Sequence, residues 1–118
     1  MTSYNASVPI YLQVVHSIKE KMATGKISPE DKLPSGRELA LKYTINPNTA
    51  ARVYQTLEQE QLLFTKRGLG SFVTEDKSKI AAIREEMAEG IIEEFLAGMD
   101  RLGISSDEAI EMLKKRNQ

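Results

Sequence analysis

The pattern of apolar and polar residues between positions 33 and 61 predicts two short helices joined by a tight turn. Ser35 followed by Glu38 fits a capping box, in which the hydroxyl and the carboxylate each bind a free backbone N–H at a helix start. Pro47 disfavours helical geometry at Asn46, so the first helix must end before this position. Asn46 then caps the second helix, and the segment is predicted to be a helix-turn-helix.

The second predicted helix has an apolar face and a polar face. Its apolar side chains recur at three- and four-residue steps, at Ala50, Val53, Tyr54 and Leu57. The opposite face carries the amide and guanidinium groups of Asn48, Arg52, Gln55 and Gln59. These groups can pair bidentately with adenine and guanine edges in a major groove. The second helix is therefore interpreted as a DNA recognition helix.

Further elements are predicted on both sides of this motif. A helix is expected over residues 8–24, and residues 26–33 are expected to form a connection. Residues 62–74 are predicted to form a β-hairpin, with two short strands joined by a turn that contains glycine. Lys66 and Arg67 make that turn basic. The hairpin is expected to pack on the helices through Leu63, Phe64 and either Phe72 or Val73. A hairpin in this place is the wing of a winged helix-turn-helix.

A second unit begins near residue 77. Its long helix, expected over 77–102, carries an apolar stripe formed by Ile80, Ile83, Met87, Ile91, Phe95 and Met99. A short last helix is expected after Ser105, which forms a second capping box with Glu108. Two helices of this size cannot bury the stripe between themselves. The stripe is therefore predicted to pack against a second copy in a homodimer, the alternative being that the helices fold back onto the first unit.

The predicted fold class is mostly α with a small β-hairpin. A winged helix-turn-helix DNA-binding domain is expected over residues 1–75, and a two-helix dimerisation tail over 76–118. The chain has 118 residues and a net charge of −1, but the charge is unevenly divided. Residues 1–74 hold nine Lys or Arg against six Asp or Glu, and residues 75–118 hold seven against eleven. The half with the helix-turn-helix is the basic half, as phosphate contact requires.

Several classes of protein are disfavoured by composition. No cysteine is present, so disulfides are excluded and a reducing cytoplasm is the expected location. No apolar run approaches the roughly 20 residues that span a bilayer, and the N-terminus does not resemble a secretory signal. The single histidine, His16, has no neighbouring ligand cluster, so neither a metal nor a cofactor is expected. Nothing in the sequence can be assigned catalytic roles, so the protein is not expected to be an enzyme.

With these residues in view, the chain resembles the GntR family of bacterial transcription regulators. The resemblance covers about residues 8–74 and is carried by VPIYLQV (8–14), DKLPSGRELA (31–40), NPNTAARVYQTLE (46–58) and KRGLGSFV (66–73). The Asn-Pro-Asn-Thr start of the recognition helix and the short tail resemble the YtrA-like subgroup of that family. In this subgroup the tail is two helices that dimerise.

The resemblance also implies roles for individual residues. Arg37 corresponds to an arginine that touches the operator, and Ser35 corresponds to a neighbouring position that contacts phosphate. Asn46, Asn48 and Thr49 correspond to the start of the recognition helix. Gly68 and Gly70 correspond to the wing tip that approaches the minor groove.

One departure from the family pattern concerns Arg52. Many relatives place an arginine two residues after the motif threonine, where this chain has Ala51 and its arginine follows one residue later. One residue is about 100° around a helix. Whether Arg52 contacts a base or a phosphate therefore stays open.

The leading hypothesis is a homodimeric, sequence-specific regulator, most simply a repressor, on a two-fold symmetric operator in double-stranded DNA. Arg37 has a structural alternative as a surface residue paired with Glu38 or Glu30, and Lys66 and Arg67 have one as a solvated turn. A winged-helix protein-interaction module is the competing function. Larger GntR members carry an effector-binding domain in the place where this chain has a short tail. The signal that controls the regulator therefore has three alternatives: a small-molecule effector of unknown identity, a partner protein, or a change in protein concentration.

Overall fold

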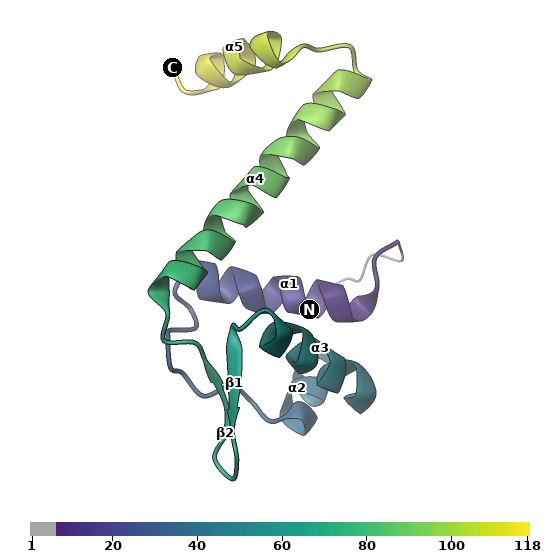
Figure 1. Ribbon diagram of the computed structural model, residues 1–118. Helices are drawn as coiled ribbons and strands as arrows, with labels where there is room; N and C mark the ends of the chain where they lie inside the picture. The colour runs from purple at the N-terminus through teal and green to yellow at the C-terminus, as the bar shows by residue number, and fades with distance from the viewer. Residues whose placement is uncertain (1–6) are drawn as a thin grey trace. The chain divides into compact units, whose positions relative to one another are not determined.

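A computed structural model describes residues 7–118, and the chain is mostly helical with one β-hairpin, as predicted. The elements in order are α1 (Ile10–Ala23), α2 (Gly36–Tyr43), α3 (Pro47–Gln59), β1 (Leu63–Lys66), β2 (Gly70–Val73), α4 (Lys77–Arg101) and α5 (Ser106–Arg116) (Figure 1). The chain divides into two compact units, one ending at Arg84 and the other formed by Glu85–Gln118. The predicted functional boundary after residue 75 stays a prediction.

The first unit is built around α3, which contacts α1, α2 and β1. The helices bury the side chains of Val14, Val15, Ile18 and Met22 from α1, Leu39 and Ala40 from α2, and Ala50, Val53, Tyr54 and Leu57 from α3. The predicted apolar face of the recognition helix is thereby confirmed. Burial of this face leaves the opposite side of α3 for solvent or a ligand.

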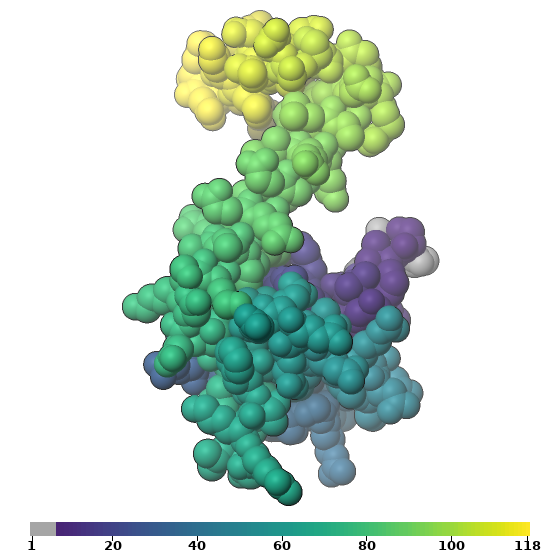
Figure 2. All heavy atoms as spheres, viewed as in Figure 1, coloured from purple at the N-terminus to yellow at the C-terminus, as the bar shows by residue number. Residues whose placement is uncertain are grey.

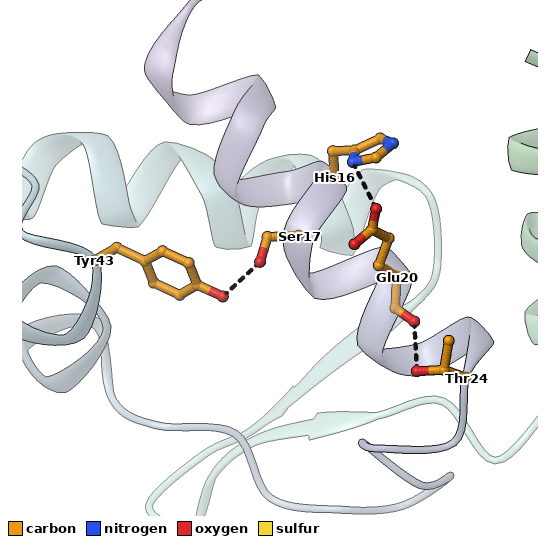
Figure 3. A network of polar contacts seen from close by, with 5 residues as sticks. All are labelled: His16, Ser17, Glu20, Thr24 and Tyr43. Carbon is orange, nitrogen blue, oxygen red and sulfur yellow. Dashed lines mark hydrogen bonds and ion pairs between the residues drawn. The ribbon is translucent and has the colours of Figure 1, made fainter. Parts of the chain in front are cut away.

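Polar contacts join the helices at the edges of this core. The hydroxyl of Tyr43, at the end of α2, lies 3.0 Å from the Ser17 hydroxyl on α1 (Figure 3). It also accepts from Lys21 Nζ at 3.2 Å. Lys19 on α1 forms an ion pair of 2.6 Å with Glu60, the residue after α3. These contacts attach α1 to both helices of the helix-turn-helix.

The hairpin turns one face towards α3 and the other away from it. Leu63 and Val73 are directly paired and buried, whereas Phe64 and Phe72 are paired on the outer face. The expectation that Phe64 packs on the helices was wrong, since its side chain is 48% exposed. Successive side chains of a strand point to opposite faces, so burial of Leu63 turns Phe64 outwards.

The segment before α2 pairs with β2 through an isolated β-bridge beside the two-stranded sheet. The Leu33 N–H donates to the Ser71 carbonyl at 2.8 Å, and the Val73 N–H donates to the Asp31 carbonyl at 2.9 Å. Lys32 is paired with Phe72 in an antiparallel bridge. The sequence indicated only a connection here, because such pairing depends on a partner that lies about forty residues away in the chain.

The second unit, Glu85–Gln118, contains the end of α4 and all of α5. The predicted capping box at the start of α5 is confirmed, since Glu108 N–H donates to Ser105 Oγ at 3.2 Å. Ala109 is buried, but this unit leaves seven large apolar side chains exposed: Ile91, Ile92, Leu96, Leu102, Ile110, Met112 and Leu113. No helix within residues 7–118 is long and apolar enough to cross a membrane.

Candidate nucleic-acid interface

The start of α2 is held by the predicted capping box. Glu38 N–H donates to Ser35 Oγ at 3.1 Å, and Ser35 N–H donates to Glu38 Oε1 at 2.9 Å. The hydrogen bonds that the Ser35 backbone and side chain make to the Glu38 carboxylate hold the pKa of this carboxyl below its usual value. Ser35 is exposed at this helix start, where free N–H groups and the positive end of the helix dipole favour an anion.

A hydrogen bond from Tyr54 joins α3 to the segment that leads into α2. The Tyr54 hydroxyl donates to the carbonyl oxygen of Pro34, immediately before Ser35. Burial raises the pKa of the Tyr54 phenol, so the hydroxyl remains a donor at all ordinary pH values. Sequence analysis placed Tyr54 on an apolar face but gave no partner for its hydroxyl. The hydrogen bond positions the start of α2 relative to α3.

The recognition helix begins as predicted. Asn46 caps it through its side-chain oxygen, which accepts from Asn48 N–H at 2.7 Å, and Pro47 occupies the first helical position. Thr49, half-buried, follows in the first turn. The free N–H groups and the positive dipole end of a helix favour an anion at this point.

The outward row of α3 is exposed. Asn48, Arg52 and Gln55 all lie on the surface of the helix. Within residues 7–118, the side-chain amides of Asn48 and Gln55 form no hydrogen bond. Unlike these two amides, the Arg52 guanidinium has a partner within the chain: it stacks on the Tyr11 ring of α1, with Cζ 3.8 Å from the ring centroid. Sequence analysis did not predict this contact.

Arg37 is exposed in the first turn of α2. The capping box engages the Glu38 carboxylate, and no ion pair of Arg37 with Glu38 or Glu30 is present in the described part of the chain. The guanidinium is therefore available to a ligand from outside the chain.

The tip of the hairpin has the backbone geometry that its glycines allow. Gly68 and Gly70 have φ values of +79° and +118°, in the range that favours glycine. Arg67 is exposed beside them, and Lys66 Nζ lies 4.8 Å from the centroid of the Phe72 ring. Figure 2 shows this hairpin as a projection from the first unit.

Lys32 is a basic residue of the wing that sequence analysis missed. Its side chain lies across Gly70, where a Cβ atom would come within 2.8 Å of Lys32 Cε. Only the β-bridge to Phe72 brings Lys32 to the wing, and neighbouring residues give no sign of that bridge. Lys32 therefore adds a third positive charge beside Lys66 and Arg67.

A cavity of about 520 Å³ opens on the outer face of the hairpin. Phe64 and Phe72 line it together with charged side chains that include Glu30, Asp76 and Lys79. The outward row of α3 does not contribute to its lining. The cavity is therefore separate from α2 and α3, although Lys66 of the wing also lines it.

Comparison with known proteins identifies the family. Residues 10–73 match the family described as bacterial regulatory proteins, gntR family. The chain belongs to the GntR family. GntR proteins are DNA-binding transcription regulators and not enzymes, so the expected class of function is confirmed.

Two relatives place the chain among YtrA-like GntR regulators. The HTH-type transcriptional repressor YtrA of Bacillus subtilis is 38% identical over 101 residues, which are 80% of this chain and 78% of the repressor. A GntR family transcriptional regulator from Listeria monocytogenes has 40% identity and a TM-score of 0.86, over 95% of this chain and 98% of that structure. The similarity to the Listeria structure covers 95% of this chain and so includes most of the tail.

A third relative has been solved with DNA. The DNA-binding domain of AraR in complex with operator ORR3 has 30% identity and a TM-score of 0.55, over 63% of this chain and 88% of that structure. The winged helix-turn-helix is thus the part that this GntR chain shares with an operator-bound protein.

Proposed function

We propose that this GntR regulator is a homodimeric repressor that binds a two-fold symmetric operator through α2, α3 and the wing. The observation that carries the proposal is the outward row of α3, where the exposed Asn48 and Gln55 amides form no hydrogen bond within residues 7–118. If this face served only the fold, its polar groups would be expected to form hydrogen bonds within the chain. Exposed, unpaired amides on a helix of this fold are suited to base edges in a major groove.

The proposed DNA contacts fall into two groups. Base contacts come from Asn48, Gln55 and Arg37, because amides and guanidinium groups can distinguish base pairs. Contacts with phosphate and sugar come from Ser35, Asn46, Thr49, Arg52, Lys66, Arg67, Gly68 and Gly70. The capping box and the Tyr54–Pro34 hydrogen bond fix the first group relative to the second.

The second unit supports the homodimer. A single chain leaves Ile91 66% exposed and Leu102 75% exposed, together with Ile92, Leu96, Ile110, Met112 and Leu113. Exposed apolar side chains on a long helix and a short one are typical of an interface between subunits. Of the predicted stripe, Met87, Phe95 and Met99 are half-buried, and Ile80, which belongs to the first unit, is half-buried as well. Ile83 is already buried in the single chain, so we assign it to the core of the monomer.

We propose repression because such a dimer can act simply by occupying DNA. A dimer that covers a promoter blocks it by occupancy, and the related YtrA protein of Bacillus subtilis is itself named a repressor. The two recognition helices of such a dimer lie about one helical turn of DNA apart, or a small multiple of it. The expected location of the protein is the cytoplasm, where this DNA lies.

Selection of a binding site from a random duplex library tests the proposal. The full chain should select an inverted repeat, and Arg37→Ala should weaken binding to it by about 1 to 3 kcal/mol. Lys26→Ala is the matched control, because Lys26 is exposed in the turn after α1 and removes the same charge. Equal affinities of the two variants would mean that Arg37 does not contact DNA. Selection of no duplex by folded protein would favour the protein-interaction module.

A further inference from the structure

The stack of Arg52 on Tyr11 distinguishes this arginine from the other exposed groups of α3. Tyr11 lies in the first turn of α1 and is half-buried, whereas Arg52 is exposed in the second turn of α3. The distance of 3.8 Å from Cζ to the ring centroid is that of a guanidinium lying over an aromatic face. Within residues 7–118, the Arg52 guanidinium has no carboxylate partner within ion-pair distance.

Helix geometry places Arg52 on one flank of the outward face. Each residue turns by about 100°, so Asn48 and Gln55 point in nearly the same direction, with Arg52 about 40° to 60° from them. Ala51 lies on the opposite flank, about 60° from Asn48. The Tyr11 ring holds the Arg52 side chain further towards α1. The guanidinium is thus directed away from the centre of the row, where base edges would lie.

We propose that Tyr11 is a positioning residue that holds Arg52 against a phosphate of the operator backbone on the α1 side of the groove. This inference rests on the proposed function, and it leaves direct base contact on α3 to Asn48 and Gln55. In helix-turn-helix complexes the recognition helix enters the groove while the first helix of the motif, here α2, crosses the backbone. Arg52 lies on a flank of α3 and not in the row that faces the base edges, so its guanidinium meets the backbone at the edge of the groove before it meets a base.

The stack makes such a contact stronger because it orders the arginine before DNA arrives. A free arginine side chain loses conformational entropy when it is immobilised on binding. A guanidinium over a ring keeps its N–H donors at its edges, where they can bind a phosphate bidentately. The energy of an exposed cation–π contact corresponds to about a two- to fivefold change in affinity per half-site.

A double-mutant cycle on the selected operator duplex tests the inference with the full chain. We would measure affinity by fluorescence anisotropy at several salt concentrations for wild type, Tyr11→Leu, Arg52→Ala and the double variant. Tyr11→Leu keeps an apolar side chain over α3 but removes the ring. It should weaken binding about two- to fivefold per half-site when Arg52 is present and by less than about 1.5-fold when Arg52 is alanine.

The salt dependence separates a phosphate contact from a base contact. Arg52→Ala should make the slope of log affinity against log salt shallower by about 0.9 per half-site, and Tyr11→Leu should leave it unchanged because the charge remains. Arg52→Ala should weaken the operator and base-substituted operators by the same factor. Lys21→Ala is the matched control, because Lys21 Nζ lies 5.4 Å from the Tyr43 ring and should have no effect on DNA affinity.

Three results would overturn the inference. Equal effects of Tyr11→Leu with and without Arg52 would mean that Tyr11 acts on DNA or on the fold directly. A melting temperature of Tyr11→Leu far below that of wild type would attribute its effect to the fold, unless Tyr11→Phe, which retains the ring, restored both stability and affinity. Loss of base preference in Arg52→Ala with an unchanged salt slope would make Arg52 a base contact. Failure of wild type to bind any duplex would instead overturn the proposed function, and this inference with it.

Discussion

The hydrogen bond from Tyr54 to Pro34 connects the recognition helix with the start of α2, so its removal should affect both stability and DNA binding. Tyr54→Phe removes one hydroxyl and keeps the ring that packs in the core. The Pro34 carbonyl then loses its protein donor. Because Pro34 is half-buried, water can replace that donor only in part.

The expected cost can be estimated from the burial of the two residues. Leaving a buried acceptor unpaired costs about 1 to 3 kcal/mol, and partial access of water to Pro34 places the value near the lower end, at about 1 to 1.5 kcal/mol. For a chain of this size, each kcal/mol lowers the melting temperature by roughly 4 °C. Tyr54→Phe should therefore melt about 4 to 6 °C below wild type.

The same variant should bind its operator less tightly even where it is fully folded. A domain of ordinary stability that loses about 1.5 kcal/mol remains more than roughly 99% folded at 25 °C. Any loss of affinity then reports displacement of Ser35 and Arg37 relative to α3, and we expect it to be about two- to tenfold.

Circular-dichroism melts and anisotropy titrations at 25 °C would measure the two effects. Tyr43→Phe is the matched control, because the Tyr43 hydroxyl contacts Ser17 and Lys21 on α1 and not the start of α2. It should lower the melting temperature without changing DNA affinity. Unchanged stability of Tyr54→Phe, or equal losses of affinity in both variants, would refute the role assigned to this hydrogen bond.

Three further outcomes are expected. Ile91→Asp should shift the chain from dimer to monomer in analytical ultracentrifugation, because burying each isoleucine in the interface contributes about 1.5 to 3 kcal/mol; an unchanged dimer would exclude this face. Since the folded pKa of Glu38 is lowered, the stability it provides is present above its ordinary pKa of 4.5 and lost as the pH falls through the folded value. The difference in melting temperature between wild type and Glu38→Ala should therefore shrink below pH 4.5, and a constant difference would contradict the capping role. Replacing both Lys66 and Arg67 by alanine should make the slope of log affinity against log salt shallower by about 1.8 per half-site. An unchanged slope would mean that the wing tip does not contact phosphates.

Local signals in the sequence predicted most of the first unit. The two capping boxes, the Asn46 cap and Pro47 are short-range features, and each appears in the structure where the spacing of residues indicated it. The apolar face of α3 was equally predictable, because a helix of known period buries residues three and four apart.

Features that depend on distant partners were not predictable. Phe64 was expected in the core because it is large and apolar, but the pairing of Leu63 with Val73 decides which face of the strand is buried. Lys32 joins the wing only through its bridge to Phe72. Such contacts arise from tertiary packing, which a period of two or 3.6 residues does not encode.

In the candidate site, too, short-range features were predictable from the sequence and contacts with distant residues were not. The outward row of α3 follows from helix periodicity, so Asn48 and Gln55 could be named from the sequence alone. The direction of Arg52 could not, because it depends on the Tyr11 ring of another helix. Likewise, the apolar stripe along α4 did not reveal that Ile83 is already buried in the single chain.

Hydroxyl-radical footprinting of the selected duplex at two salt concentrations would show whether the protein recognises DNA as a symmetric dimer. We predict two protected backbone clusters related by two-fold symmetry, about one helical turn or a small multiple apart. Between 50 and 200 mM salt, binding through 6 to 10 phosphate contacts should weaken by about 10³-fold or more. A single protected cluster would contradict the dimer, and absence of protection by folded protein at low salt would contradict DNA recognition itself.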